Sequence, residues 1–308
     1  MTTLHQLGRM VLAMLSMTGR VTMLGLSRWT GNGGRYRTIQ RFFHRTLPWA
    51  AILWCFVRTH LLTPGADVLL IGDAWVTTKA GTETYGVDRF FSRIAGKPVP
   101  GGSRFALALV SRRERQAFPV ALEQVVREPV TAQAPLPVAA KRKPGRPKGS
   151  STQAKADAPL NAEHTRIRAM IQGRLARMHS HVTVTYRVLA GHFGNQHAAR
   201  MARRLGGHLI SKLRNDSARY DPYDGPYAGR GPRRIAGERI DPHAIPEHFL
   251  KQTTGEDGVE TRIYPVEARH ATCDQPLNVV GIVKRHRTTG THAHVGPHQA
   301  SAFTSVRK

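Results

Sequence analysis

The spacing of apolar residues predicts helices over residues 1–60. The apolar positions of the first segment follow one another at intervals of one, three or four: Leu4, Leu7, Val11, Met14 and Leu15. This spacing places them on one face of an α-helix. After a glycine-rich turn signal at 30–34, Tyr36, Ile39 and Phe43 are expected to form the apolar face of another helix. The chain is therefore expected to begin with helices joined by a turn.

Strand patterns begin near residue 66. The apolar run Val68–Ile71 leads into Asp73, a pattern typical of a buried strand with an acidic residue at its C-terminal tip. Further strands are predicted over 82–87 and 105–110. These strands are expected to lie side by side in one sheet, with Asp73 on the central one.

A strand, a helix and a strand follow one another later in the chain, as in α/β proteins. The expected elements are a helix over 161–178, a strand over 182–189, a helix over 196–205, and strands over 208–213, 261–266 and 277–283. The sequence therefore predicts an α/β fold that is preceded by a helical N-terminal region.

These patterns divide the chain into a helical region over 1–60 and an α/β domain over 61–284. Two stretches of the domain lack periodicity: a basic, proline-rich insertion at 129–160 and a segment rich in glycine and proline at 221–258. Residues 285–308 contain few large apolar residues, so a disordered or degenerate tail is expected there.

The charge of the chain indicates its partner. The sequence has 46 lysines and arginines against 20 aspartates and glutamates, a net charge of +26 over 308 residues. The positive charges of such an excess repel one another in a compact state unless a polyanion neutralises them. Nucleic acid is therefore the expected partner. The two cysteines, Cys55 and Cys273, lack zinc-finger spacing. The apolar run 47–57 is well short of the ~20 residues that cross a membrane, so no span and a cytoplasmic location are predicted.

Two basic segments are candidate DNA contacts. Arg37, Arg41 and Arg45 recur every four residues and predict the basic face of the second helix of a helix-turn-helix; a solvated face on a helical bundle is the alternative. Residues 145–147, Gly-Arg-Pro, resemble an AT-hook that inserts arginine into a narrow minor groove; a charged linker is the alternative. The predicted contacts are Arg28, Arg35, Arg37, Arg41, Arg45, Lys141, Arg142, Lys143, Arg146 and Lys148.

Asp73 is the candidate metal ligand. An acid at the tip of a central strand is a common ligand of Mg²⁺, because its oxygens face solvent and a phosphate can complete the coordination. Two-metal phosphodiester chemistry, however, requires several carboxylates. An aspartate after a strand is also a common cap or turn residue, so both interpretations stay open at this point.

Five blocks of sequence occur in a fixed order: Leu24–His44, Leu70–Asp73, Gly81–Ser92, Gly191–Asn195 and Leu209–Ser217. Together they resemble bacterial insertion-sequence transposases of the DDE type. The resemblance implies an RNase H-like mixed sheet with flanking helices, in which two aspartates and a glutamate hold two Mg²⁺ ions for nicking and strand transfer. It also implies double-stranded DNA at the element ends as partner, homo-oligomers or mixed oligomers with an intact transposase, and a nucleoid-associated location in bacteria.

The resemblance assigns Asp73 to the first of the three carboxylates, and the chain departs from the family at the other two. Ala190 stands at the position of the second aspartate, where a methyl group cannot bind a metal. His192 is nearby, but a neutral imidazole is a poor ligand for Mg²⁺, so a packed or hydrogen-bonding role is expected. The pattern that begins at Tyr227 has Arg234 where the glutamate should be.

These departures predict a truncated and degenerate transposase-like protein that retains Asp73 alone and binds Mg²⁺ weakly. A purely DNA-binding regulator or inhibitor of transposition is the alternative. A basic RNA-binding protein would also explain the charge, but it leaves the blocks around Asp73 and Phe193 unexplained.

Overall fold

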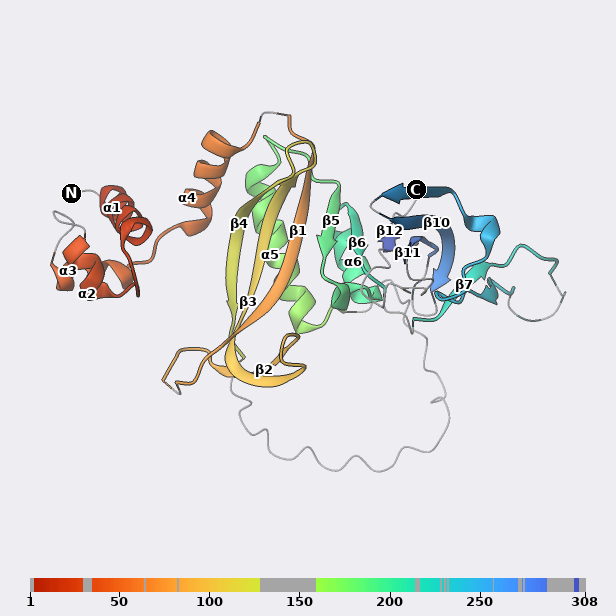
Figure 1. Ribbon diagram of the computed structural model, residues 1–308, viewed down its shortest axis with the longest axis horizontal. Coiled ribbons are helices and arrows are strands. Elements are labelled where there is room, and N and C mark those ends of the chain that lie inside the picture. Colours follow the sequence, from red (N-terminus) through yellow and green to blue (C-terminus); the bar gives the residue numbers. More distant parts are fainter. Residues whose placement is uncertain are drawn as a thin grey trace, which may run out of the picture. The chain divides into compact units, whose positions relative to one another are not determined.

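The computed structural model describes most of the chain (Figure 1). The described residues are 3–29, 35–63, 65–81, 83–127, 159–213, 217–227, 229, 231, 233–256, 258–270, 273, 275–286 and 302–304. The chain divides into two compact units, Met1–Ile52 and Leu53–Lys308. Their boundary falls inside helix α4 (Trp49–Phe56), somewhat before the boundary at residue 60 that the sequence suggested.

The smaller unit contains helices α1 (Thr3–Ser16), α2 (Met23–Trp29) and α3 (Tyr36–Phe43). Its buried apolar residues come from all three helices: Met10, Ala13, Leu26, Ile39 and Phe42. Helices α2 and α3 contact each other, so the predicted pair of helices on either side of residues 30–34 is present. Three short helices around a small core are an arrangement that helix-turn-helix proteins use.

Helix α3 differs from its prediction in two respects. Its buried face holds Ile39 and Phe42, whereas Tyr36 and Phe43 are exposed. The buried face therefore continues from Ile39 to the residue three positions later, Phe42, and not to the residue four positions later, Phe43. The helix ends at Phe43, and Arg45 lies beyond it, where its guanidinium donates a hydrogen bond to Thr3. The basic face of the helix therefore consists of Arg37 and Arg41 without Arg45.

The larger unit begins with α4 and a π-helical turn, Val57–Leu61, and continues as an α/β fold with two sheets. The helices that follow are α5 (Ala162–Met178) and α6 (Gln196–Arg204). The strands are β1 (Val68–Thr78), β2 (Asp88–Ser92), β3 (Lys97–Ser111), β4 (Gln116–Val125), β5 (Tyr186–Leu189), β6 (His208–Ser211), β7 (Arg219–Pro222), β8 (Ala236–Arg239), β9 (Gln252–Glu256), β10 (Val259–His270), β11 (Leu277–His286) and β12 (Ala302–Thr304).

The first sheet has the strand order β12-β6-β5-β1-β3-β2, and β4 also pairs with β3. Strand β3 pairs antiparallel with β1, β2 and β4, whereas β5 pairs parallel with both β1 and β6. Helix α5 precedes β5, and α6 connects β5 to β6. This mixed sheet with its flanking helices is an RNase H-like arrangement, which confirms the predicted fold class.

One face of this sheet packs against α5 and α6 (Figure 1). The helices contribute Ile167, Ile171 and Met201 to a core that also contains Phe105 and Leu107 of β3. Helix α5 begins where expected because the Asn161 side chain accepts a hydrogen bond from the His164 amide, which caps the helix. The predicted strand-helix-strand unit of β5, α6 and β6 is likewise present.

The second sheet has the order β11-β10-β7-β8, and β9 also pairs with β10. The strands predicted over 261–266 and 277–283 are present within β10 and β11, which are both longer. Their buried side chains pack with those of neighbouring segments: Leu213, Ile240, Val266, Ala268, Leu277 and Val279.

Two strand predictions near Asp73 need correction, and one strand was missed. Residues 83–86 form a turn instead of part of a strand, because Gly86 takes a left-handed conformation with φ +69°, and β2 begins only at Asp88. Strand β1 continues to Thr78, because residues 101–111 of β3 pair along its whole length. Asp73 therefore lies in the middle of the strand and not at its tip. Strand β4 was not predicted.

The predicted tail at 285–308 lies largely outside the described residues. Residues 285–286 belong to the end of β11, and residues 302–304 form β12, which pairs antiparallel with β6. The basic run at 141–148 also lies outside the described residues.

Arg187 gives a test of the packing between β5 and α6. Its side chain is 2% exposed, and Nη2 donates a hydrogen bond of 2.9 Å to the carbonyl of Leu205, just after α6. Burial lowers the pKa of this guanidinium. Gly207 leaves room for it, because a Cβ there would lie 1.3 Å from Arg187 Nη1 and 2.7 Å from the carbonyl oxygen of Thr185.

We therefore expect Gly207→Ala to lower the free energy of unfolding by about 2 kcal/mol or more, since the new methyl displaces a buried charge. The control is Gly173→Ala in α5, where a Cβ meets no atom within 4 Å. This control variant should raise the free energy of unfolding by about 0.5–1 kcal/mol. Urea unfolding of both variants measures the difference, and equal stabilities would contradict the packing role of Gly207.

Candidate active site

The pairing of β1 with β5 places Asp73 beside Ala190. Gly72 pairs with Leu189, and the Ala190 amide donates a hydrogen bond of 3.3 Å to the Gly72 carbonyl. Asp73 and Ala190 follow these two residues on parallel strands, at the point where β5 ends. The two positions that the resemblance assigned to the first two aspartates are therefore neighbours, and one of them carries a methyl group.

The Asp73 side chain lies on the sheet face opposite the helices. Val68 and Leu70 are buried, and Ala74 packs against the core, so the alternation of the strand directs Asp73 to the other face. Its carboxylate is exposed, and Oδ1 accepts a hydrogen bond of 2.7 Å from the Ala74 amide. On β3 its neighbour is Ala106, which adds no polar group.

The loop after Ala190 is held firmly in place. Phe193 is fully buried, with its ring 6.0 Å from that of Phe105. The Ser211 hydroxyl donates a hydrogen bond of 3.1 Å to the carbonyl of Ala190. Gly194 passes so close to β6 that a Cβ would lie 2.2 Å from the carbonyl oxygen of Lys212. Burial lowers the pKa of Lys212. The position of residue 190 is therefore fixed by contacts on both sides.

His192 has partners of its own and does not replace the missing aspartate. The Arg93 guanidinium lies 3.3 Å from Nδ1 and can donate a hydrogen bond to it. Nε2 faces the carboxylate of Glu163 at the start of α5, 3.6 Å away. This interaction lowers the pKa of Glu163 despite partial burial. The hydrogen-bonding role expected for His192 agrees with these contacts. No local sequence pattern indicates Arg93 or Glu163, because each lies far from His192 along the chain.

The described residues do not fit a pair of Mg²⁺ ions. Nowhere in the described ranges do three His, Cys, Asp or Glu side chains come close enough together to hold a metal ion. In the part of the chain that the structure describes, no α-helix follows β6 that could carry the family glutamate. Arg234, at the position that the pattern would give to the glutamate, donates to the carbonyls of Ala236 and Gly237.

The predicted DNA contacts fall into two groups. Those of the smaller unit are all exposed: Arg28, Arg35, Arg37, Arg41 and Arg45. Arg28 lies in the last turn of α2, and the next three lie in or directly before α3. The contacts predicted in the basic run lie outside the described residues: Lys141, Arg142, Lys143, Arg146 and Lys148.

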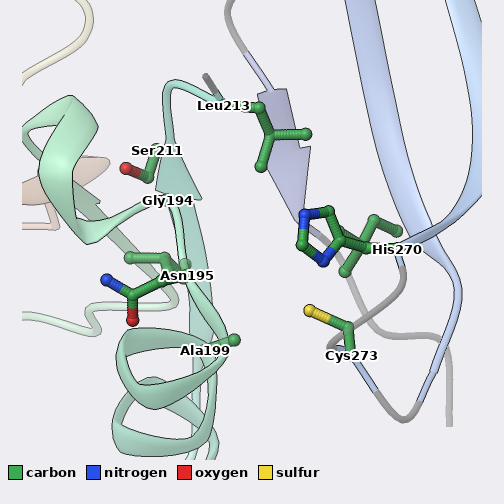
Figure 2. Close-up of a pocket in the computed structure, with 9 residues that line it drawn as sticks. Gly194, Asn195, Ala199, Ser211, Leu213, His270 and Cys273 are labelled. Atoms are coloured by element: carbon green, nitrogen blue, oxygen red, sulfur yellow. The ribbon is translucent and has the colours of Figure 1, made fainter. Parts of the chain in front are cut away.

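A separate cavity lies on the other side of the Gly194–Asn195 loop (Figure 2). The His270 ring and the Cys273 thiol face this loop across the cavity, and burial together with the charge of Arg219 lowers the pKa of His270. Leu213 and Leu277 supply apolar lining, and none of the described residues that line the cavity carries a carboxylate. It therefore adds no ligand to the region around Asp73.

His164 makes the start of α5 sensitive to acid. The residue is 3% exposed, and Nδ1 donates a hydrogen bond of 2.6 Å to the side-chain oxygen Oδ1 of Asn161, which leaves Nε2 buried without a partner among the described residues. Burial lowers the pKa of His164; Glu163 opposes this shift, while His197 and His192 add to it. Folding therefore favours the neutral form of the ring.

Because the folded pKa lies below the unfolded value of about 6.5, the contribution of His164 to stability is complete above pH ~6.5 and is lost as the pH falls. We expect His164→Phe to lose less stability than the unmodified protein between pH ~7.5 and ~5.5 in urea unfolding. The exposed His179→Gln, at the other end of α5, is the control and should keep the full pH dependence, because His179 does not contribute to the pKa shift of His164. Parallel pH profiles for all three proteins would contradict this role.

Comparison with known proteins agrees with this geometry. No curated protein matches the chain. In the ranges that the structure describes, no helix is long and apolar enough to span a membrane. The model of a family described as DDE superfamily endonuclease, whose members act on DNA with divalent metal ions, matches residues 2–270. With the match covering most of its length and the RNase H-like sheet placing Asp73 beside residue 190, the chain belongs to the DDE superfamily endonucleases.

Proposed function

We propose that the chain is a transposase-like protein that binds the double-stranded DNA of insertion-sequence ends without cutting or joining it. The observation that carries this proposal is Ala190, which lies beside Asp73 where β5 ends. A methyl group at this position leaves Asp73 without a second carboxylate on the neighbouring strand. The chain thus keeps the domain of a DNA-cleaving family but not the ligand set of its chemistry.

The requirement for several carboxylates supports this conclusion. Two-metal cleavage uses ions ~4 Å apart, one at the attacking oxygen and one at the leaving oxygen, and shared carboxylates hold them there. Asp73 offers one exposed carboxylate, and one of its oxygens already accepts a hydrogen bond from the Ala74 amide. A single carboxylate in water binds Mg²⁺ weakly, because the ion gives up its hydration shell reluctantly.

DNA binding is supported by the placement of positive charge. Ile39 and Phe42 of α3 pack into the small core, so Arg37 and Arg41 face outward from a helix that follows a second short helix. A helix with this basic outer face can enter the major groove, where guanidinium groups contact phosphates and base edges. The net charge of +26 adds attraction to any stretch of duplex.

A protein that binds element ends without cutting them acts as a regulator or inhibitor of transposition. It would compete with an intact transposase for the same DNA, or form mixed oligomers with it in which one subunit lacks its metal ligands. Ala190 favours this role, because the substitution removes a metal ligand and leaves the fold of the surrounding loop intact.

The purified chain is expected neither to nick a supercoiled plasmid nor to join DNA ends with Mg²⁺ or Mn²⁺. Ala190→Asp should strengthen Mn²⁺ binding, measured by electron paramagnetic resonance, because a second carboxylate joins Asp73. The control combines Asp73→Ala with Ala190→Asp, and this double variant should lose the gain in Mn²⁺ binding. Metal-dependent nicking by the unmodified chain that Asp73→Ala abolishes would show that other residues complete the site.

Arg37→Ala combined with Arg41→Ala is expected to weaken binding to element ends more than binding to unrelated duplex, because base contacts are lost together with phosphate contacts. Arg113→Ala combined with Arg115→Ala, in the exposed turn between β3 and β4, is the control that removes the same charge. Fluorescence anisotropy over a range of salt concentrations measures both. Equal losses for the two pairs on both duplexes would reduce α3 to a phosphate-contacting surface.

A further inference from the structure

Strand β1 extends past the end of β5 on one side of Asp73. The parallel pairing with β5 stops at Gly72, whereas the antiparallel pairing with β3 continues to Thr78. Among the strands that the structure describes, β1 therefore has a neighbour on one side only from Asp73 onward. This part of the strand borders the loop that begins at Ala190.

Trp75 lies on this extension, on the same sheet face as Asp73. The two residues are two positions apart on one strand, and Ala74 between them packs against the core. The Trp75 side chain is 43% exposed although its indole is the largest apolar group on the strand. The buried core beneath is already filled by Phe105 and Leu107, so the fold leaves this ring on the surface.

The neighbours of Trp75 on β3 leave room beside the ring and supply one positive charge. Trp75 pairs with Arg104, and the residues paired with Asp73 and Thr77 are the small Ala106 and Gly102. The guanidinium of Arg104 lies close to Gly102: a Cβ added to this glycine would be 3.4 Å from Nη1. Within the described part of the chain, Arg104 has no hydrogen bond or ion pair.

An exposed indole beside an uncommitted guanidinium is suited to a nucleic-acid strand whose bases are not paired. A base stacks on an aromatic ring through its flat face, and arginine neutralises the adjacent phosphate. Inside a duplex both faces of each base are covered by neighbouring base pairs, so such a platform binds single strands and melted ends. The positive charge of Arg104 also offsets the repulsion between the Asp73 carboxylate and a phosphate.

We infer that Trp75 stacks on an unpaired base of bound DNA while Arg104 contacts a neighbouring phosphate, so that the sheet face around Asp73 binds single-stranded or locally melted DNA. This inference rests on the proposed function, because it adds a second DNA contact to a chain that binds duplex through its N-terminal helices. The platform does not require metal ions.

The test uses the full chain and a short single-stranded oligonucleotide that carries 2-aminopurine at alternate positions, with its fully paired duplex for comparison. Stacking on Trp75 should quench the 2-aminopurine fluorescence. Trp75→Ala should remove this quenching and weaken single-strand binding by about tenfold, whereas Trp75→Phe should restore much of both. For the single strand, Arg104→Ala should make the plot of log affinity against log salt concentration less steep, by the amount expected for the loss of about one phosphate contact.

Tyr186→Ala is the matched control, because Tyr186 is an exposed aromatic residue on the same sheet face at the start of β5. It lies about 20 Å along the strands from Trp75. This variant should bind both forms of DNA as the unmodified chain does. Far-UV circular dichroism and urea midpoints establish that all variants are folded.

Single-strand affinity and quenching that do not change in Trp75→Ala, with duplex binding intact, would overturn the inference and leave the proposed function standing. Failure of the unmodified chain to bind either form of DNA would overturn both. Equal weakening of single-strand and duplex binding by Trp75→Ala would also overturn the inference, because stacking on an unpaired base predicts a selective effect.

Discussion

Gly72 lies where β1 meets β5, and side chains from two other strands fill the space above its backbone. A Cβ at this position would lie 2.7 Å from Leu189 Cδ2 and 2.8 Å from Phe105 Cζ. The missing side chain lets Leu189 and Phe105 close over the strand pair, and the pair in turn aligns Asp73 with Ala190. The Gly191–Asn195 loop, the start of α6 and the exposed extension of β1 all take their positions from this alignment.

The charges of the larger unit are arranged so that much of the positive excess stays available. A few arginines have carboxylate partners, such as Arg112 with Asp67 at 2.8 Å, and these pairs are exposed and contribute little to stability. Arg187 and Arg234 instead donate to main-chain carbonyls, which satisfies their hydrogen bonds without neutralising their charge. An external polyanion is the natural partner for the charge that remains.

Local patterns predicted the elements whose signals lie within a few residues. The Asn161 cap and the apolar spacing after it specify α5, and the period change after Asn195 specifies α6. Strand β4 was missed because Pro119 and a β-bulge opposite Leu107 and Ala108 interrupt its alternation. Asp73 was placed at a strand tip because the apolar run Val68–Ile71 ends just before it, and the pairing with β3 that carries β1 on through Trp75 to Thr78 is a long-range contact.

The pairing of Gly72 with Leu189 also has a consequence for the order of folding. The antiparallel strands β1 to β4 are close in sequence and can pair soon after synthesis, whereas β5 follows only after the long segment that contains α5. Closing so large a loop carries an entropy cost before the parallel contacts repay it. Until then one edge of β1 is unpaired, and an unpaired edge can join a strand of another chain. We therefore expect the slow step of folding and an aggregation-prone edge at the same strand edge that aligns Asp73 with Ala190.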